Sequence, residues 1–129
     1  MARNEFTFPS ADGKTQIHAV EWLPDGEVRA VLQIAHGVSE YILRYEPFVN
    51  YLTARGFGVV GHDHLGHGSS ATPNGKPMYF GPKGSWNWVV QDIETRRQLA
   101  KERFPNAKRE YYSLLPDLIT SVSQGKIDG

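Results

Sequence analysis

The stretch from residue 30 to residue 68 constrains the fold of this chain more than any other part of the sequence. It holds two short apolar runs, residues 30–35 and 58–61, and each breaks into a polar loop that contains glycine. One helix-sized segment separates the runs. This order of strand, loop, helix, strand and loop is typical of a βαβ unit. In such units, ligand sites lie beyond the carboxyl ends of the parallel strands. The sequence therefore predicts an α/β fold with a candidate site in the two loops.

The segments on either side of this unit complete the predicted fold. Residues 5–8 and 15–23 are expected to form an antiparallel hairpin, because Asp12-Gly13 supplies the positive φ of a tight turn. Helices are expected at residues 45–55 and from about 85 to 103, where apolar side chains recur at helical spacing. We therefore expect a mainly parallel sheet, begun by an antiparallel hairpin, with helices on its faces.

The start of the second helix carries two further expectations. The hydroxyl of Ser85 is placed to cap the free N–H groups of the first turn. Trp86 and Trp88 follow directly, and aromatic residues in such positions are more often part of the core than of a substrate cleft. Both tryptophans are therefore predicted to pack in the core.

Composition excludes several classes of function. A chain of 129 residues is long enough for one domain, and 14 basic residues balance 14 acidic ones, so no net charge attracts nucleic acid. The absence of cysteine excludes disulfides and thiolate metal sites within these residues. The first residues contain no apolar run typical of a signal peptide, so a soluble, cytoplasmic protein is expected.

The loop sequences resemble a known family. His36-Gly37-Val38, Glu40 and the run Asp63-His64-Leu65-Gly66-His67-Gly68-Ser69-Ser70 are similar to the amino-terminal part of α/β-hydrolases. The similarity covers residues 6–104 and is greatest to the lysophospholipase and monoacylglycerol lipase branch, which is also grouped with serine aminopeptidases (S33-like). The resemblance implies a serine hydrolase of carboxylic esters that needs no cofactor and takes a small-molecule acyl ester as substrate.

The resemblance also assigns roles to loop residues. The backbone N–H of Val38, in the loop that begins with His36 and Gly37, would form half of an oxyanion hole, which stabilises the charge that develops on an ester carbonyl. The wall beside it would be shaped by the second loop. Its residues in this role are Asp63, Gly66, His67, Gly68 and Ser69, with Asp63 and His67 as braces rather than as catalytic groups.

The catalytic triad of the family is missing from this sequence. No Gly-x-Ser-x-Gly occurs, and the segment 121–125 supplies only the trailing glycine after Ser123. No strand is expected after Phe104, since residues 109–124 have helical spacing of apolar side chains. We interpret residues 1–129 as one incomplete domain, in which residues 109–129 correspond to the helix after a missing strand five and nucleophile elbow. We assign no catalytic residue and expect the chain to be inactive.

Two other classes of function stay open. A non-catalytic fragment or interaction module would depend on a partner or on self-association through an exposed sheet edge, here the edge near the fourth strand. A metal-dependent hydrolase would use His62, His64 and His67, whose spacing suits zinc. Such a site also needs an acidic residue before its last histidine, where this chain has Gly66, and further distal ligands. We therefore expect no bound metal.

Overall fold

A computed structural model describes residues 1–37, 39–70 and 82–110 of the chain. Its elements follow the expected order of hairpin, βαβ unit and second helix. They are β1 (Ala2–Pro9), β2 (Gln16–Leu23), β3 (Ala30–Ala35), the 3₁₀ turn η1 (Ile42–Tyr45), α1 (Glu46–Thr53), β4 (Phe57–His62), the 3₁₀ turn η2 (Gly68–Ser70), α2 (Trp86–Arg103) and β5 (Lys108–Glu110).

The strands form one mixed sheet in the order β1-β2-β4-β3-β5. The pairs β1–β2 and β2–β4 are antiparallel, whereas β3 runs parallel to both β4 and β5. The predicted α/β fold with its opening hairpin is confirmed. Gly13, with φ of 80°, provides the positive φ expected in the hairpin turn, and Gly56, with φ of 89°, follows α1.

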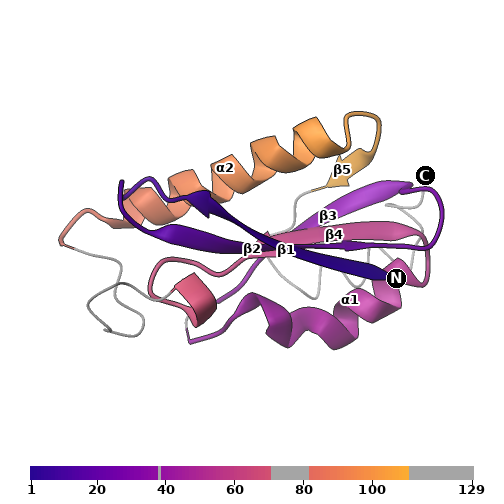
Figure 1. The fold of residues 1–129 in the computed structure, drawn as a ribbon, viewed down its shortest axis with the longest axis horizontal. Helices are drawn as coiled ribbons and strands as arrows, with labels where there is room; N and C mark the ends of the chain where they lie inside the picture. The colour runs from indigo at the N-terminus through magenta and orange to yellow at the C-terminus, as the bar shows by residue number, and fades with distance from the viewer. Residues whose placement is uncertain (38, 71–81, 111–129) are drawn as a thin grey trace.

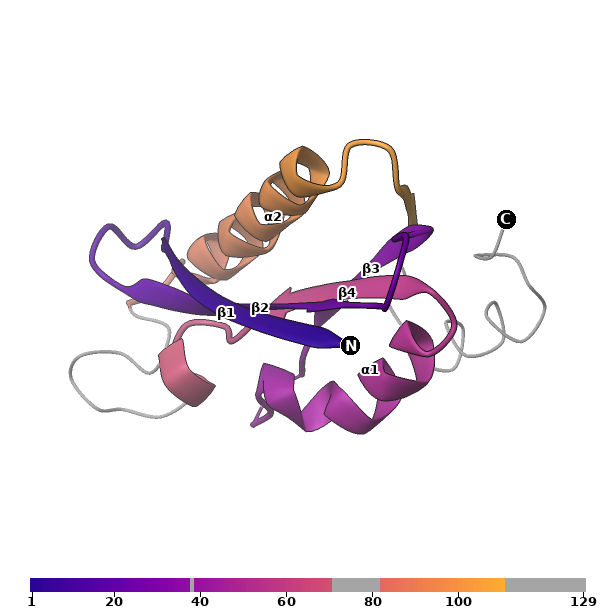
Figure 2. The same cartoon turned by 45° about the vertical axis from the view of Figure 1, so that its right-hand side comes forward.

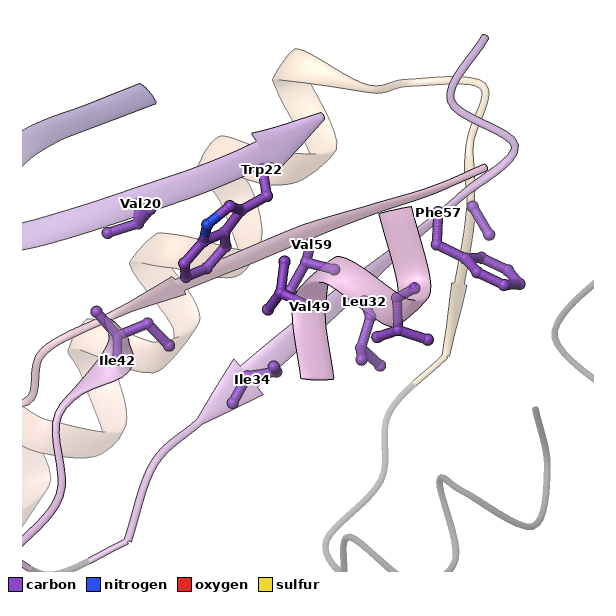
Figure 3. Close-up of a cluster of buried hydrophobic side chains, with 10 residues drawn as sticks. Val20, Trp22, Leu32, Ile34, Ile42, Val49, Phe57 and Val59 are labelled. Atoms are coloured by element: carbon purple, nitrogen blue, oxygen red, sulfur yellow. The ribbon is translucent and has the colours of Figure 1, made fainter. Parts of the chain in front are cut away.

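The two helices lie on opposite faces of the sheet, α1 on one side and α2 on the other (Figures 1 and 2). The face toward α1 holds the largest apolar cluster (Figure 3). Its buried members are Val20, Trp22, Ala30, Leu32, Ile34, Ile42, Val49, Leu52, Phe57 and Val59. Because β3 and β4 alternate their side chains between the faces, Val31 and Val60 pack on the α2 side instead, near Ala100.

Helix α2 meets the sheet through charged residues as well as apolar ones. Asp92 and Arg96 are 0% and 2% exposed. The Asp92 carboxylate accepts hydrogen bonds from the Ser10 hydroxyl (2.7 Å) and the Ala11 N–H (2.8 Å). The Arg96 guanidinium donates to the carbonyls of Gly61 (3.2 Å) and Val20 (3.1 Å). These bonds fix α2 to the hairpin and to the centre of the sheet.

Two expectations for the start of α2 are wrong in part. Trp86 is 62% exposed and does not belong to the core, whereas Trp88 packs against the buried cluster around Phe8. Ser85 occupies the position before the helix, but its hydroxyl donates to the Pro82 carbonyl and does not cap the first turn. The backbone of Ser85 is already helical, so its side chain turns back toward the preceding loop.

The expectation that no strand follows α2 is also wrong. Lys108–Glu110 forms β5, which pairs in parallel with β3 from Ala30↔Lys108 to Leu32↔Glu110. Arg109 therefore does not begin a helix, and residues 111–124 lie outside the described residues. The fourth strand is not at an edge of the sheet, because β4 lies between β2 and β3, and the outer strands of the described sheet are β1 and β5. Among the described residues, no helix has both the length and the apolar character to cross a bilayer.

Candidate functional site

The parallel pairing of β3 with β4 brings the two loops to one edge of the sheet. The register pairs Ala35 with His62, so the first loop (residues 36–40) and the second loop (residues 62–70) leave the sheet side by side. Nearly all of the second loop is buried up to His67, although it contains three histidines and an aspartate. Buried polar groups need partners, and the hydrogen bonds of these side chains define the local geometry.

His36 and His64 join the two loops by a reciprocal pair of hydrogen bonds. The backbone N–H of His64 donates to Nε2 of His36 (3.0 Å), and Nε2 of His64 donates to the carbonyl of His36 (3.0 Å). His36 Nδ1 donates to the Gly37 carbonyl (2.8 Å). This set requires a neutral His36 ring with its proton on Nδ1, because Nε2 must accept. The rings also pack against each other, with centroids 4.1 Å apart.

Asp63 is the second connection between the loops. One oxygen of its buried carboxylate accepts the N–H of Ile42 (2.7 Å), at the start of η1 directly after the first loop. The other accepts the N–H of Ser69 (3.0 Å) in the second loop. Gly68 lies against this carboxylate with φ of 47°, and a β carbon there would stand 2.5 Å from Asp63 Cγ. Only glycine leaves room for the aspartate at this position.

The remaining second-loop residues form a tight turn. Gly66 has φ of 74°, and its N–H donates to the Ser70 carbonyl (3.3 Å). The buried His67 donates from Nδ1 to the Leu65 carbonyl (2.9 Å). The Leu65 side chain fills the cluster beneath α2 with Phe8 and Ile17. The second loop is therefore held both by its own main chain and by the core.

Glu40 fixes the first loop from its far end. Its carboxylate accepts the N–H of Gly37 (2.9 Å) and the hydroxyl of Tyr45 (3.0 Å). The Glu40 N–H donates back to the Gly37 carbonyl (3.3 Å), which closes a turn in which Ser39 has φ of 62°. Val38, the predicted oxyanion donor, lies outside the described residues. The described residue before it, Gly37, is held to Glu40 by two hydrogen bonds.

Burial disfavours the charged form of His36, His62 and His64. Burial, together with the neighbouring His64 and Arg96, lowers the pKa of His62 well below its ordinary value. Burial and the adjacent His36 lower the pKa of His64 to about 4. Burial is also the main cause that lowers the pKa of His36. The lowered pKa values favour neutral imidazoles at His36, His62 and His64 at pH 7, and the hydrogen bonds from His64 N–H and to the Gly37 carbonyl require this form of His36.

The geometry of His62, His64 and His67 differs from that of a metal site. His64 and His67 direct ring N–H groups toward main-chain carbonyls, so these nitrogens are not available as ligands. Across the described ranges, no group of three or more His, Asp or Glu side chains is arranged to hold a metal ion. The arrangement instead packs imidazole rings edge to face, with the His62 and His64 centroids 5.0 Å apart.

Sequence reasoning missed the contribution of the hairpin to this site. His18 of β2 lies between two carboxylates, 2.7 Å from Asp63 and 2.7 Å from Glu5. The Ser70 hydroxyl accepts the backbone N–H of His18 (2.8 Å). The sequence did show that His18 is a polar residue among the apolar side chains of the predicted strand at residues 15–23. Its link to Asp63 depends on the β2–β4 pairing, which sequence periodicity does not specify.

Comparisons with known proteins agree on one family. The profile of the family described as serine aminopeptidase, S33 matches residues 26–113. The monoacylglycerol lipase of Mycolicibacterium smegmatis is 31% identical over 107 residues, and the human monoglyceride lipase is 36% identical over 61 residues. Among solved structures, a carboxyl esterase from Bacillus coagulans, in complex with glycerol, superposes with a TM-score of 0.76 at 31% identity.

These matches cover most of this chain but a minor part of the relatives. The Mycolicibacterium lipase is matched over 83% of this chain and 36% of its own length, and the Bacillus esterase over 84% and 35%. For the human lipase the shares are 47% and 20%. The chain thus spans about a third or less of the length of these three relatives.

Proposed function

Since the chain belongs to the serine aminopeptidase S33 family of lipase- and esterase-like α/β-hydrolases, we propose that it forms the amino-terminal part of a carboxylic ester hydrolase. The names of its relatives favour acyl esters of glycerol as the substrate class. The observation that carries the proposal is the fixed pair of loops at the carboxyl ends of β3 and β4, joined through His36, His64 and Asp63.

The role proposed for the first loop is to stabilise an oxyanion. When a nucleophile attacks an ester, the carbonyl oxygen gains negative charge, and a preorganised N–H donor lowers the energy of this state. The backbone N–H of Val38 would be such a donor. The Gly37–Glu40 contacts support this role, because they hold Gly37, directly before Val38, to Glu40 and use the Gly37 N–H elsewhere.

The role proposed for the second loop is to form the wall beside the oxyanion donor. Asp63 and His67 stabilise the loop from within, and Gly66, Gly68 and Ser69 supply its turns and main-chain contacts. The remaining parts of the reaction, which are the nucleophile, the base and the group that orients the base, have no counterpart in the motifs of these 129 residues. A complementary segment would have to supply them.

A chimera tests the proposal directly. Residues 6–104 would replace the matched segment of the Mycolicibacterium lipase. The rest of that lipase would supply the catalytic groups of the chimera. We expect this chimera to hydrolyse a monoacylglycerol, because the loops would supply the oxyanion donor and the wall. The parent lipase is the positive control, and a chimera without its nucleophilic serine is the negative one. A chimera that melts cooperatively but hydrolyses no ester would overturn the proposal.

The 129-residue chain alone is expected to show no ester hydrolysis. It contains no Gly-x-Ser-x-Gly, so no serine is set on a nucleophile elbow. Incubation with p-nitrophenyl esters and with a fluorophosphonate probe would measure this, with the chimera as the positive control. Labelling of the chain that disappears in Ser123→Ala would contradict the expectation and would identify residues 121–125 as a variant elbow.

A further inference from the structure

The imidazole of His18 contacts two carboxylates at once. Its Nδ1 lies 2.7 Å from Asp63 Oδ2, and its Nε2 lies 2.7 Å from Glu5 Oε1. A carboxylate can only accept, so both ring nitrogens must carry protons for both bonds to form. The arrangement therefore fits an imidazolium that bridges β1 to the residue after β4. The third charged group nearby is Arg3, whose Nε lies 3.7 Å from Glu5.

The position of the Asp63 carboxylate decides how the two loops meet. Asp63 Oδ1 accepts from Ile42, after the first loop, and Oδ2 accepts from Ser69 in the second. His18 donates to the same Oδ2, and its own carbonyl accepts the N–H of Asp63 (2.9 Å). Rotation of the carboxylate would break both loop contacts, and the bond from His18 opposes that rotation.

We propose that His18 is a positioning residue of the site, which orients Asp63 and thereby holds the first and second loops in register. The inference rests on the proposed function, because it gives a role in ester hydrolysis to a strand that carries no residue of the reaction itself. It also predicts properties of the folded chain that do not depend on any activity. His18 acts only through Asp63.

The protonation of His18 agrees with this geometry. Burial by itself would lower the pKa of His18, but hydrogen bonds to Asp63 and Glu5 outweigh it and raise the pKa above its ordinary value. A side chain that only filled space would have no such requirement. The imidazole C2 hydrogen of a histidine exchanges with deuterium at a rate that follows its pKa, so this property can be measured for His18 by mass spectrometry.

Backbone hydrogen exchange of the 129-residue chain provides the main test. The variant His18→Phe keeps an aromatic ring but removes both donors, and His18→Gln retains a side-chain N–H donor. We expect His18→Phe to speed exchange in segments 39–45 and 64–70 on the order of tenfold, as for the loss of a charge-assisted hydrogen bond. His18→Gln should restore part of the protection. Glu21→Gln, on the other face of the same strand, is the matched control and should leave both segments unchanged.

The exchange rates of the two segments decide whether His18 positions Asp63. Unchanged exchange in both segments for His18→Phe, with protection of β3 and β4 retained, would overturn it. If His18→Phe does not fold, Glu5→Gln decides, because it removes only the negative charge of the outer, exposed partner that favours the imidazolium of His18. This variant should lower the pH midpoint of His18 C2 exchange and speed exchange in the same two segments, and no change in either would overturn the proposal. An inactive chimera together with the expected exchange pattern would reject the proposed function and leave the positioning role intact.

Discussion

Replacing Val38 by proline in the active chimera is expected to lower kcat for ester hydrolysis by about 10²–10³-fold, the usual effect of removing one oxyanion donor. Proline has no backbone N–H, so the substitution removes the proposed donor without touching a side chain that contacts the acyl group. The preceding residue is Gly37, which tolerates the restriction that proline places on its neighbour. Steady-state kinetics on a monoacylglycerol would measure kcat and KM separately.

The matched control for this variant is Val38→Ala, which changes the side chain but keeps the N–H. Its kcat should stay close to that of the unsubstituted chimera, and both variants should melt at similar temperatures. If alanine lowers kcat as much as proline does, the valine side chain rather than its N–H matters for the reaction. An unchanged kcat in the proline variant would show that the oxyanion is stabilised by other donors.

Acidification is expected to destabilise the chain between pH 6.5 and about pH 4. In this window the unfolded histidines, with an ordinary pKa of 6.5, bind protons that the folded His36, His62 and His64 exclude. The unfolded state therefore binds more protons, so the free energy of unfolding falls as the pH falls. His64, with a folded pKa of about 4, would account for about 3 kcal/mol of this loss.

Urea melts at pH 7 and pH 4.5, compared with those of His64→Gln, would measure this effect. The glutamine retains an N–H donor for the His36 carbonyl but does not titrate, so its variant should lose less stability on acidification. His18 contributes with the opposite sign, since its raised pKa gives stability that is present below pH 6.5 and lost as the pH rises through the folded value. Equal losses in the variant and the parent chain would contradict a role for His64.

The strands and helices were predictable where local chemistry decides them. Asp12-Gly13 fixes the hairpin turn, and the apolar runs of β3 and β4 fit strands covered on both faces. The predictions that were wrong concern properties that depend on contacts between residues far apart in the sequence. Trp86 is apolar but largely exposed to solvent, and the three residues of β5 form a strand that depends on β3 as its partner.

The candidate site was predictable in its location but not in its bonds. The order of strands and glycine-containing loops identified both loops, since the carboxyl ends of parallel strands share one edge. The reciprocal His36–His64 contact depends on which ring nitrogen carries the proton, and that depends on the final packing. The bridge from Glu5 through His18 to Asp63 joins residues far apart in the sequence, and only the β2–β4 pairing brings them together.

The contact of Arg96 with the sheet has a consequence for how sequences of this fold can diverge. Its guanidinium binds the carbonyl oxygens of Val20 and Gly61, which belong to the main chain and would be present whatever side chains those strands carried. The helix is thus anchored to atoms that mutation of the strands cannot remove. Substitutions in β2 and β4 can alter the apolar packing under α2, but they leave both acceptors of the arginine in place, so this one anchor of the helix depends on Arg96 alone.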